Sequence, residues 1–150
     1  MQTTTLQHYE IDGLIFRAED CVEGHLINPQ LPKAFDDTPN EERSRLEMAM
    51  WWGRPFITID TWEGLERHTV SWQAMLRAEG KEYATAEADM PARLAKDKAS
   101  WFASYPDGKR FSVRCLDGGA WDRSTNWGAF PTLDEAIEVA TNGPVWRRQE

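Results

Sequence analysis

Residues 105–144 read YPDGKRFSVRCLDGGAWDRSTNWGAFPTLDEAIEVATNGP, and this stretch decides the C-terminal part of the fold. Within it Phe111, Val113 and Cys115 alternate with polar neighbours, which is the period-two pattern of a strand buried on one face. A second short strand is expected at residues 127–130, after a glycine-containing loop. Because Cys115 shares a strand face with two apolar residues, we expect its thiol to be buried.

A helix is expected directly after the second strand. The run Thr-Leu-Asp-Glu at 132–135 is a capping box, in which the threonine accepts from an unpaired amide and the glutamate reaches back. Apolar residues then recur at helical spacing, at Leu133, Ala136, Ile137 and Ala140. Asn-Gly-Pro at 142–144 ends the helix, and residues 145–148 are expected to return as an edge strand. The pattern predicts a ββα(β) module.

The first two thirds of the chain predict a different mixture of elements. The expected elements are a hairpin at 6–11 and 14–18, a loop at 28–40, a helix from Thr38 that ends before Gly53, a strand at 56–60, and mostly helical structure over 71–104. Asp12-Gly13 suits the hairpin turn, and Thr38 opens a second capping box with Glu41. The secondary structure of residues 62–70 is ambiguous from the sequence.

These elements predict an α+β fold of short antiparallel strands with several helices. The run Tyr-Pro-Asp-Gly at 105–108 opposes continuation of a helix. We therefore expect an acidic N-terminal region over 1–104 and a C-terminal module over 105–150, packed as one globular unit.

Charge and composition limit the possible functions. The 150 residues carry a formal net charge of −8, which opposes nucleic-acid phosphates and anionic membranes at long range. Residues 1–60 contain eleven acidic and five basic side chains, so the acidity is concentrated there. No apolar run approaches the roughly 20 residues that span a bilayer, and the start of the chain is unlike a signal peptide. We expect a soluble, cytoplasmic protein whose two cysteines are thiols.

Catalytic and metal-binding motifs give weak signals. Cys21 and His25 are four residues apart and would share a helix face, but no paired metal-ligand motif accompanies them. Acidic neighbours at Glu19, Asp20 and Glu23 would raise the pKa of a nucleophilic Cys21. Phosphate-loop, dinucleotide and serine-hydrolase motifs are missing from the sequence. We expect no metal, no cofactor and no catalytic residues, although a small enzyme with a dispersed site remains an alternative.

Eight tryptophans are the unusual feature of the composition. Trp72 and Trp101 fall on apolar helical faces, and we expect both to be core residues. Trp51 and Trp52 cannot face the same direction on a helix, and Trp121 lies in a glycine loop. At least one of these three is therefore expected to meet solvent or a partner.

Two segments resemble known proteins. Residues 127–136, WGAFPTLDEA, resemble the strand-into-helix step of plant ethylene-responsive DNA-binding domains and phage integrase arms. Residues 115–130, CLDGGAWDRSTNWGAF, look like segments of small uncharacterised proteins of plasmids and phages. Small acidic proteins of such elements often inhibit host defence, as anti-CRISPR and anti-restriction proteins do. The second resemblance implies an inhibitor of a nucleic-acid-targeting defence complex.

The favoured hypothesis is a non-catalytic protein-binding accessory protein of a mobile genetic element. Its acidic region would dock on the basic surface of a protein partner, such as a CRISPR effector, and a tryptophan would anchor it. The expected partner-binding residues are Asp36, Asp37, Glu41, Glu42 and Trp52. The alternatives to this hypothesis are a small enzyme with a dispersed site and a nucleic-acid-binding module that uses the C-terminal sheet. The module would require a contiguous basic face on residues 109–127.

Overall fold

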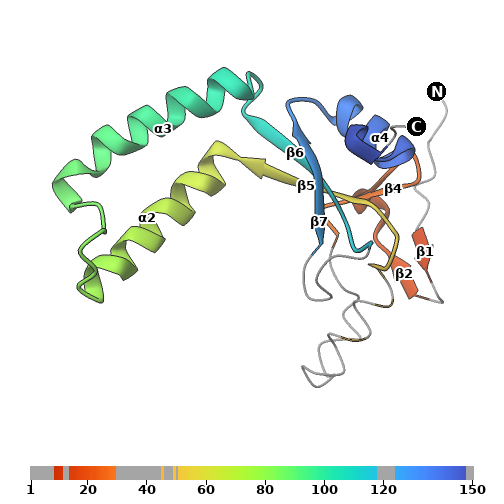
Figure 1. Cartoon of the computed structure of the whole chain (residues 1–150), viewed down its shortest axis with the longest axis horizontal. Helices are drawn as coiled ribbons and strands as arrows, with labels where there is room; N and C mark the ends of the chain where they lie inside the picture. The colour runs from red at the N-terminus through yellow and green to blue at the C-terminus, as the bar shows by residue number, and fades with distance from the viewer. Residues whose placement is uncertain are drawn as a thin grey trace. The chain divides into compact units, whose positions relative to one another are not determined.

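A computed structural model describes residues 9–11, 14–29, 45, 49, 51–117 and 124–147 (Figure 1). The strands are β1 (Tyr9–Ile11), β2 (Leu14–Phe16), β3 (Cys21–Val22), β4 (His25–Ile27), β5 (Phe56–Thr61), β6 (Lys109–Cys115) and β7 (Thr125–Phe130). The helices are α2 (Trp62–Ala78), α3 (Met90–Ser104) and α4 (Leu133–Asn142), with short 3-10 turns η1 (Ala18–Asp20), η3 (Glu87–Asp89) and η4 (Val145–Arg147). The expected α+β class is confirmed.

The strands form two sheets. β1 and β2 make the expected N-terminal hairpin, in which Tyr9 pairs with Phe16 and Ile11 with Leu14. The other five strands form one sheet in the order β3-β4-β5-β6-β7. β4 and β5 are parallel, whereas only antiparallel strands were expected. The chain between them runs from Asn28 to Pro55, which is long enough for the crossover that a parallel pair requires.

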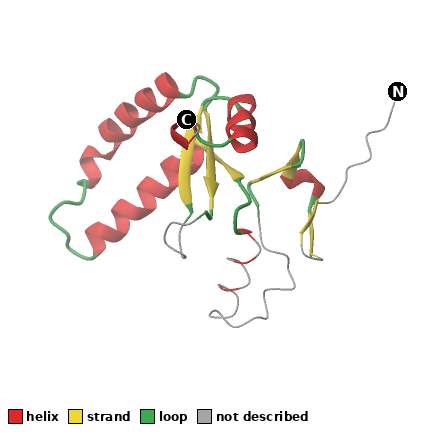
Figure 2. Cartoon of the chain, turned by 45° about the vertical axis from the view of Figure 1, so that its right-hand side comes forward, coloured by secondary structure: helices red, strands yellow, loops and turns green. Residues whose placement is uncertain are grey.

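The core of the sheet lies beneath α4. Val113 and Ile57 are fully buried beside Ala136, Val139 and Ala140 of the helix, and Figure 2 shows α4 beside the strands. The capping box forms as expected: Thr132 Oγ1 accepts from the Glu135 amide at 3.3 Å and donates to Glu135 Oε2 at 2.7 Å. The buried stripe is centred on Val139, so Leu133 and Ile137 lie at its margins and are only partly buried.

The expected edge strand at 145–148 is wrong over the residues that are described. Val145–Arg147 forms the 3-10 turn η4, in which the Arg147 amide donates to Pro144 O at 2.9 Å. Pro144 is buried, has a fixed φ and has no amide hydrogen to donate to a neighbouring strand. This position therefore favours a turn over entry into a sheet.

α2 and α3 run antiparallel beside each other (Figure 2). α2 begins at Trp62, within the segment whose pattern is ambiguous, because Thr61 caps it by accepting from the Gly64 amide at 3.2 Å. α3 begins at Met90 with proline in its first turn, as expected. No helix in the described part of the chain combines the length and apolar content needed to cross a membrane.

The chain divides into two compact units, residues 1–59 with 111–150 and residues 60–110. We call them the sheet unit and the helical unit. This division differs from the expected regions 1–104 and 105–150 because β5 and β6 are neighbours in one sheet. The helical unit is the connection between these two strands.

The expected loop at 28–40 and the expected helix from Thr38 are described only in part. Asn28 and Pro29 are described, and the remainder of that loop lies outside the described residues. Thr38 and Glu41, the expected capping box, lie outside them as well, whereas Arg45, Ala49 and Trp51 are helical. Gly53 has a φ of 72°, so the chain leaves the helix where the sequence predicts.

Candidate functional site

Trp51 and Trp52 face different environments. The Trp51 ring is buried and packs edge-on against Phe56, with ring centroids 5.4 Å apart. Trp52 is 50% exposed. Its backbone bridges to Leu116, and the next amide, that of Gly53, donates to Leu116 O at 2.6 Å. Trp52 is therefore held next to the C-terminal end of β6 with half of its side chain in solvent.

Asp117 follows Leu116 in the sequence, and its carboxylate holds side chains from two other segments. Its Oδ2 accepts from Trp127 Nε1 at 2.9 Å and from Arg147 Nη2 at 2.6 Å. Burial of Asp117 would by itself raise its pKa, but hydrogen bonds from Thr125, Trp127 and Arg147 outweigh burial and lower the pKa below its usual value. The carboxylate therefore fixes one indole and one guanidinium together.

The guanidinium of Arg147 lies near two indole rings. The guanidinium carbon is 5.3 Å from the centroid of Trp127 and 5.1 Å from that of Trp146, within the range of a cation–π interaction. Trp146 is 54% exposed and Val145 is 68% exposed. Val145, Trp146 and Arg147 form the turn η4, in which Arg147 contacts Asp117 and lies near Trp127, and we call these three residues the aromatic–arginine surface.

Cys115 lies beneath this region and has little nucleophilic character. It is 1% exposed, which confirms the expected burial. Burial, and then the charge of Asp117, raise its pKa from 9.0 to about 11. At neutral pH the side chain is a protonated thiol, and a thiol is a poor nucleophile compared with a thiolate.

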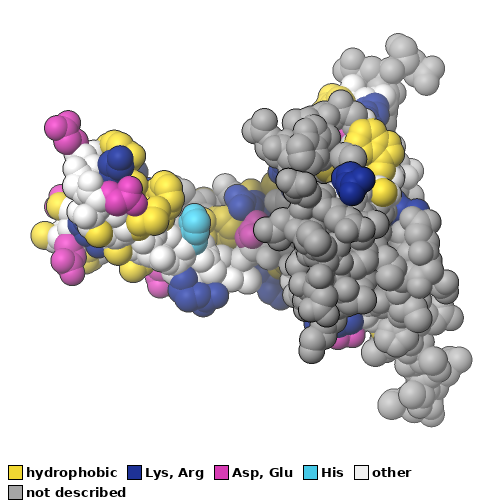
Figure 3. Space-filling model, turned by 90° about the horizontal axis from the view of Figure 1, so that it is seen from below, with side chains coloured by type: hydrophobic (Ala, Val, Ile, Leu, Met, Phe, Trp, Pro, Cys, Tyr) yellow, Lys and Arg dark blue, Asp and Glu magenta, His cyan; other side chains and the backbone are white. Residues whose placement is uncertain are grey.

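The helical unit carries further exposed apolar side chains. Figure 3 shows apolar groups lying among charged ones over this unit. The exposed large apolar residues of the helical unit are Val70, Trp72 and Met75 on α2, Tyr83 in the connection and Phe102 on α3. The expectation that Trp72 is a core residue is wrong, because the buried face of α2 is centred on Trp62, Gln73 and Leu76. Trp72 precedes Gln73 and is turned about 100° from it.

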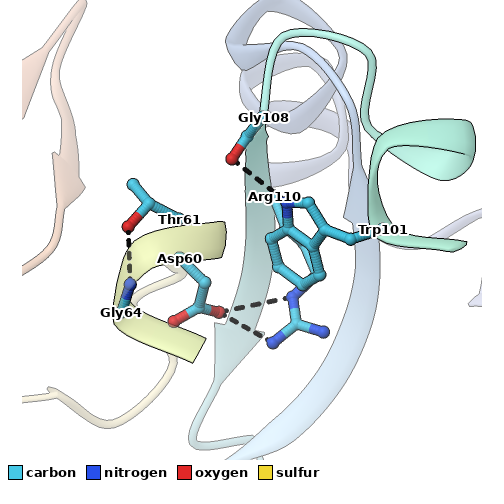
Figure 4. Close-up of polar contacts among 6 residues, drawn as sticks. All are labelled: Asp60, Thr61, Gly64, Trp101, Gly108 and Arg110. Atoms are coloured by element: carbon cyan, nitrogen blue, oxygen red, sulfur yellow. Dashed lines mark hydrogen bonds and ion pairs between the residues drawn. The ribbon is translucent and has the colours of Figure 1, made fainter. Parts of the chain in front are cut away.

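Trp101 is buried, as expected, at the base of the helical unit. Its Nε1 donates to Gly108 O at 3.1 Å, and the guanidinium of Arg110 lies 5.0 Å from its ring centroid (Figure 4). Arg110 Nη2 also donates to Asp60 Oδ2 at 2.9 Å. This cluster joins the two ends of the helical unit and has a structural role.

The structure describes one of the five expected partner-binding residues. Trp52 is half-exposed next to Leu116. Asp36, Asp37, Glu41 and Glu42 lie outside the described residues. Sequence reasoning missed Val145, Trp146 and Arg147 because it placed them on an edge strand. The apolar-aromatic-basic run that follows Pro144 was the available signal.

The nucleic-acid alternative requires basic side chains that are available on the C-terminal sheet. Arg110 is paired with Asp60. Arg114 donates to Ser124 Oγ at 2.5 Å and to Ser124 O at 2.7 Å. Arg123 lies outside the described residues. Two of these arginines are therefore already bound within the protein, which weakens this alternative.

Cys21 and His25 do not share a helix face. They lie on the antiparallel strands β3 and β4, where Cys21 pairs with Leu26 and Val22 pairs with His25. The spacing of four residues reflects a tight hairpin around Glu23 and Gly24, both with positive φ. Within the described ranges, no group of three His, Cys, Asp or Glu side chains is arranged to hold a metal ion.

No protein-family model, curated protein or solved structure matches this chain.

Proposed function

We propose that this chain is a non-catalytic protein-binding module that contacts its partner through the aromatic–arginine surface. The observation that carries the proposal is the half-exposed Trp146 beside Arg147, an arginine that Asp117 already orders. Trp52, the second half-exposed tryptophan, is held at the C-terminal end of β6 and is included in the proposed contact. Tryptophan and arginine are the side chains most enriched among residues that dominate binding energy. Ordering Arg147 before binding also reduces the entropy lost on association.

The chemistry of nearby groups supports binding over catalysis. Cys115 is buried and its pKa is raised to about 11, so it does not supply a thiolate. Asp117 is committed to Trp127 and Arg147, and its lowered pKa keeps it ionised. An ionised, fully engaged carboxylate is unsuited to general acid–base work at neutral pH.

The class of partner is proposed from charge. An acidic chain associates fastest with a basic protein surface, and proteins that handle nucleic acids carry such surfaces. We therefore retain a nucleic-acid-handling complex, including a host defence effector, as the proposed partner. The aromatic–arginine surface would supply the short-range contacts after encounter.

The test compares three single tryptophan truncations. The tagged protein is used to capture its partner, and the variants Trp52→Ala, Trp146→Ala and Trp72→Ala are then compared for partner retention and dissociation rate. Trp72 is the matched control because it is 47% exposed but lies on the helical unit. We expect Trp52→Ala and Trp146→Ala each to weaken binding about 30-fold or more, as loss of ~2 kcal/mol implies. Equal effects from all three variants would contradict the proposal.

A further inference from the structure

Thr85 lies in the connection between α2 and α3 and is bound by side chains from both helices (Figure 1). From α2, Gln73 Oε1 accepts from the Thr85 amide at 2.6 Å, and Arg77 Nη1 donates to Thr85 O at 2.7 Å. From α3, Arg93 Nη1 donates to Thr85 Oγ1 at 2.6 Å. Gln73 is 5% exposed, so the Thr85 backbone is anchored to the buried face of α2. Two guanidinium groups therefore converge on one fixed threonine.

The two arginines bring more positive charge to Thr85 than their described contacts neutralise. Within the described part of the chain, Arg77 contacts only a neutral carbonyl. Arg93 Nε lies 3.5 Å from Asp97 Oδ2, and two guanidinium charges against one carboxylate leave a net positive charge. A guanidinium has five N–H donors, so Arg93 can keep Asp97 while it binds another oxygen. Its planar geometry matches the oxygens of a phosphate.

The Thr85 hydroxyl is available for reaction. The residue is only partly buried. Its Oγ1 accepts from Arg93, so the hydroxyl hydrogen points away from this arginine. Among the described residues, no group accepts that hydrogen. The oxygen that would carry a new group is thus already in contact with a cation.

The residues after Thr85 suit recognition by an enzyme with a basic substrate groove. Glu87 and Asp89 stand two and four positions after it, and both are exposed. Carboxylates in such a segment attract a basic groove. Neither contacts Arg77 or Arg93 among the described ion pairs. Because both are in solvent, their repulsion of a phosphoryl group on Thr85 is screened.

From this arrangement we propose that Thr85 is a phosphorylation site and that Arg77 and Arg93 hold the phosphoryl group once it is attached. In this reaction Thr85 Oγ1 attacks the γ-phosphorus of a nucleoside triphosphate bound by a protein kinase. The Oγ1–phosphorus bond forms, the bond to the β,γ-bridging oxygen breaks, the nucleoside diphosphate leaves, and the hydroxyl proton passes to a base of the kinase. The added negative charge would tie α2 to α3 more strongly than the neutral hydroxyl does. This site lies on the helical unit and does not depend on the proposed protein-binding function.

The first test asks whether the folded protein accepts a phosphoryl group at Thr85. The intact chain is incubated with magnesium ATP and a protein kinase that prefers acidic residues after its acceptor. We expect mass spectrometry of proteolytic fragments to place one phosphoryl group on Thr85. Thr85→Val has nearly the same shape and should lose that group. A folded protein that gains no phosphoryl group at Thr85 would overturn the proposal.

The second test asks whether the arginines hold the phosphoryl group. Phosphorus-31 NMR of the phosphorylated protein is followed against pH, in the folded state and in urea. Nearby guanidinium groups favour the dianion, so the second pKa of the folded phosphothreonine should lie below its usual value of about 6. We expect an acid dissociation constant about tenfold larger than in urea.

Variants assign this effect to the named side chains. Arg93→Gln should remove most of the tenfold difference, because it removes the charge nearest to Oγ1. Lys96→Gln is the matched control, since it removes one positive charge from an exposed position of the same helix. It should change the dissociation constant less than twofold. Equal dissociation constants in the folded and unfolded protein, or equal effects of the two variants, would overturn the assignment of these arginines.

Discussion

Asp60 and Arg110, the first and last residues of the helical unit, are joined by a charged contact: Arg110 Nη2 lies 2.9 Å and Nε 3.3 Å from the same Asp60 oxygen. The guanidinium also lies over the ring of Trp101. The two residues are 50 positions apart, so this contact closes the base of a long helical connection.

Two variants should separate the contributions of this ion pair and of the ring stacking to the stability of the helical unit. Both side chains are a third to a half exposed, so Asp60→Asn should lower the free energy of unfolding by ~1 kcal/mol or less. Arg110→Ala also removes the stacking on Trp101, which contributes about another 0.5–1 kcal/mol. Urea unfolding followed by circular dichroism measures both. If the two variants cost the same, the stacking contributes nothing.

Thr132 should stabilise α4 through its hydroxyl. Thr132→Ala leaves the Glu135 amide without its cap and should cost about 1 kcal/mol. Thr132→Ser keeps the hydroxyl and should behave nearly as the wild type. Thermal unfolding of the two variants checks this. A serine variant as unstable as the alanine variant would contradict the capping role.

The contribution of Asp117 to the free energy of unfolding should depend on pH. Its pKa is below the usual 3.8 in the folded protein, so the ionised form is favoured by folding. Such a carboxyl contributes its stability above its unfolded pKa and loses it as the pH falls through the lower, folded value. Asp117→Asn should therefore destabilise the protein at neutral pH, and the difference from the wild type should shrink in acid. Urea unfolding of both proteins from neutral to acidic pH measures this difference. If the difference in the free energy of unfolding stays constant with pH, the proposed role of the Asp117 charge is wrong.

The two cysteines should react differently with a thiol reagent. Cys115 is buried and its pKa is raised from 9.0 to about 11, whereas Cys21 is only partly buried. Mass spectrometry after mildly alkaline labelling should show modification of Cys21 and protection of Cys115 until the protein unfolds. Because the folded pKa is the higher one, the stability that the Cys115 thiol contributes is complete below pH 9.0 and is lost as the pH rises toward about 11. Rapid labelling of Cys115 in folded protein would contradict its placement.

The acidic N-terminal residues should control the rate of association. Replacing Asp36, Asp37, Glu41 and Glu42 by lysine should slow binding to a basic partner and reduce its dependence on salt. Trp52→Ala should instead mainly accelerate dissociation. Binding kinetics at two salt concentrations separate these effects. Faster association after charge reversal would favour a nucleic-acid partner, because added positive charge attracts phosphates.

Local physics in the sequence was sufficient for several elements. The Thr132 cap, the period-two pattern of β6 and the Asp12-Gly13 hairpin depend on neighbours within a few residues. The start of α2 was missed although Thr61 is an ordinary N-cap residue. Gly64 occupies the position where a capping box has Glu or Gln, and glycine lowers helix propensity.

The candidate sites depended on contacts that no local pattern contains. Adjacent residues on a helix point in directions about 100° apart, so the sequence already required Trp51 and Trp52 to face different ways. It did not reveal that Trp52 is the exposed one, or that Arg147 lies near two indoles and pairs with Asp117, because these features depend on how distant segments pack. The same holds for His25, whose Nε2 contacts Thr141 Oγ1 across 116 positions of sequence. Hydrogen bonds and burial act over a few ångströms in space, so separation along the chain does not reveal which side chains they join.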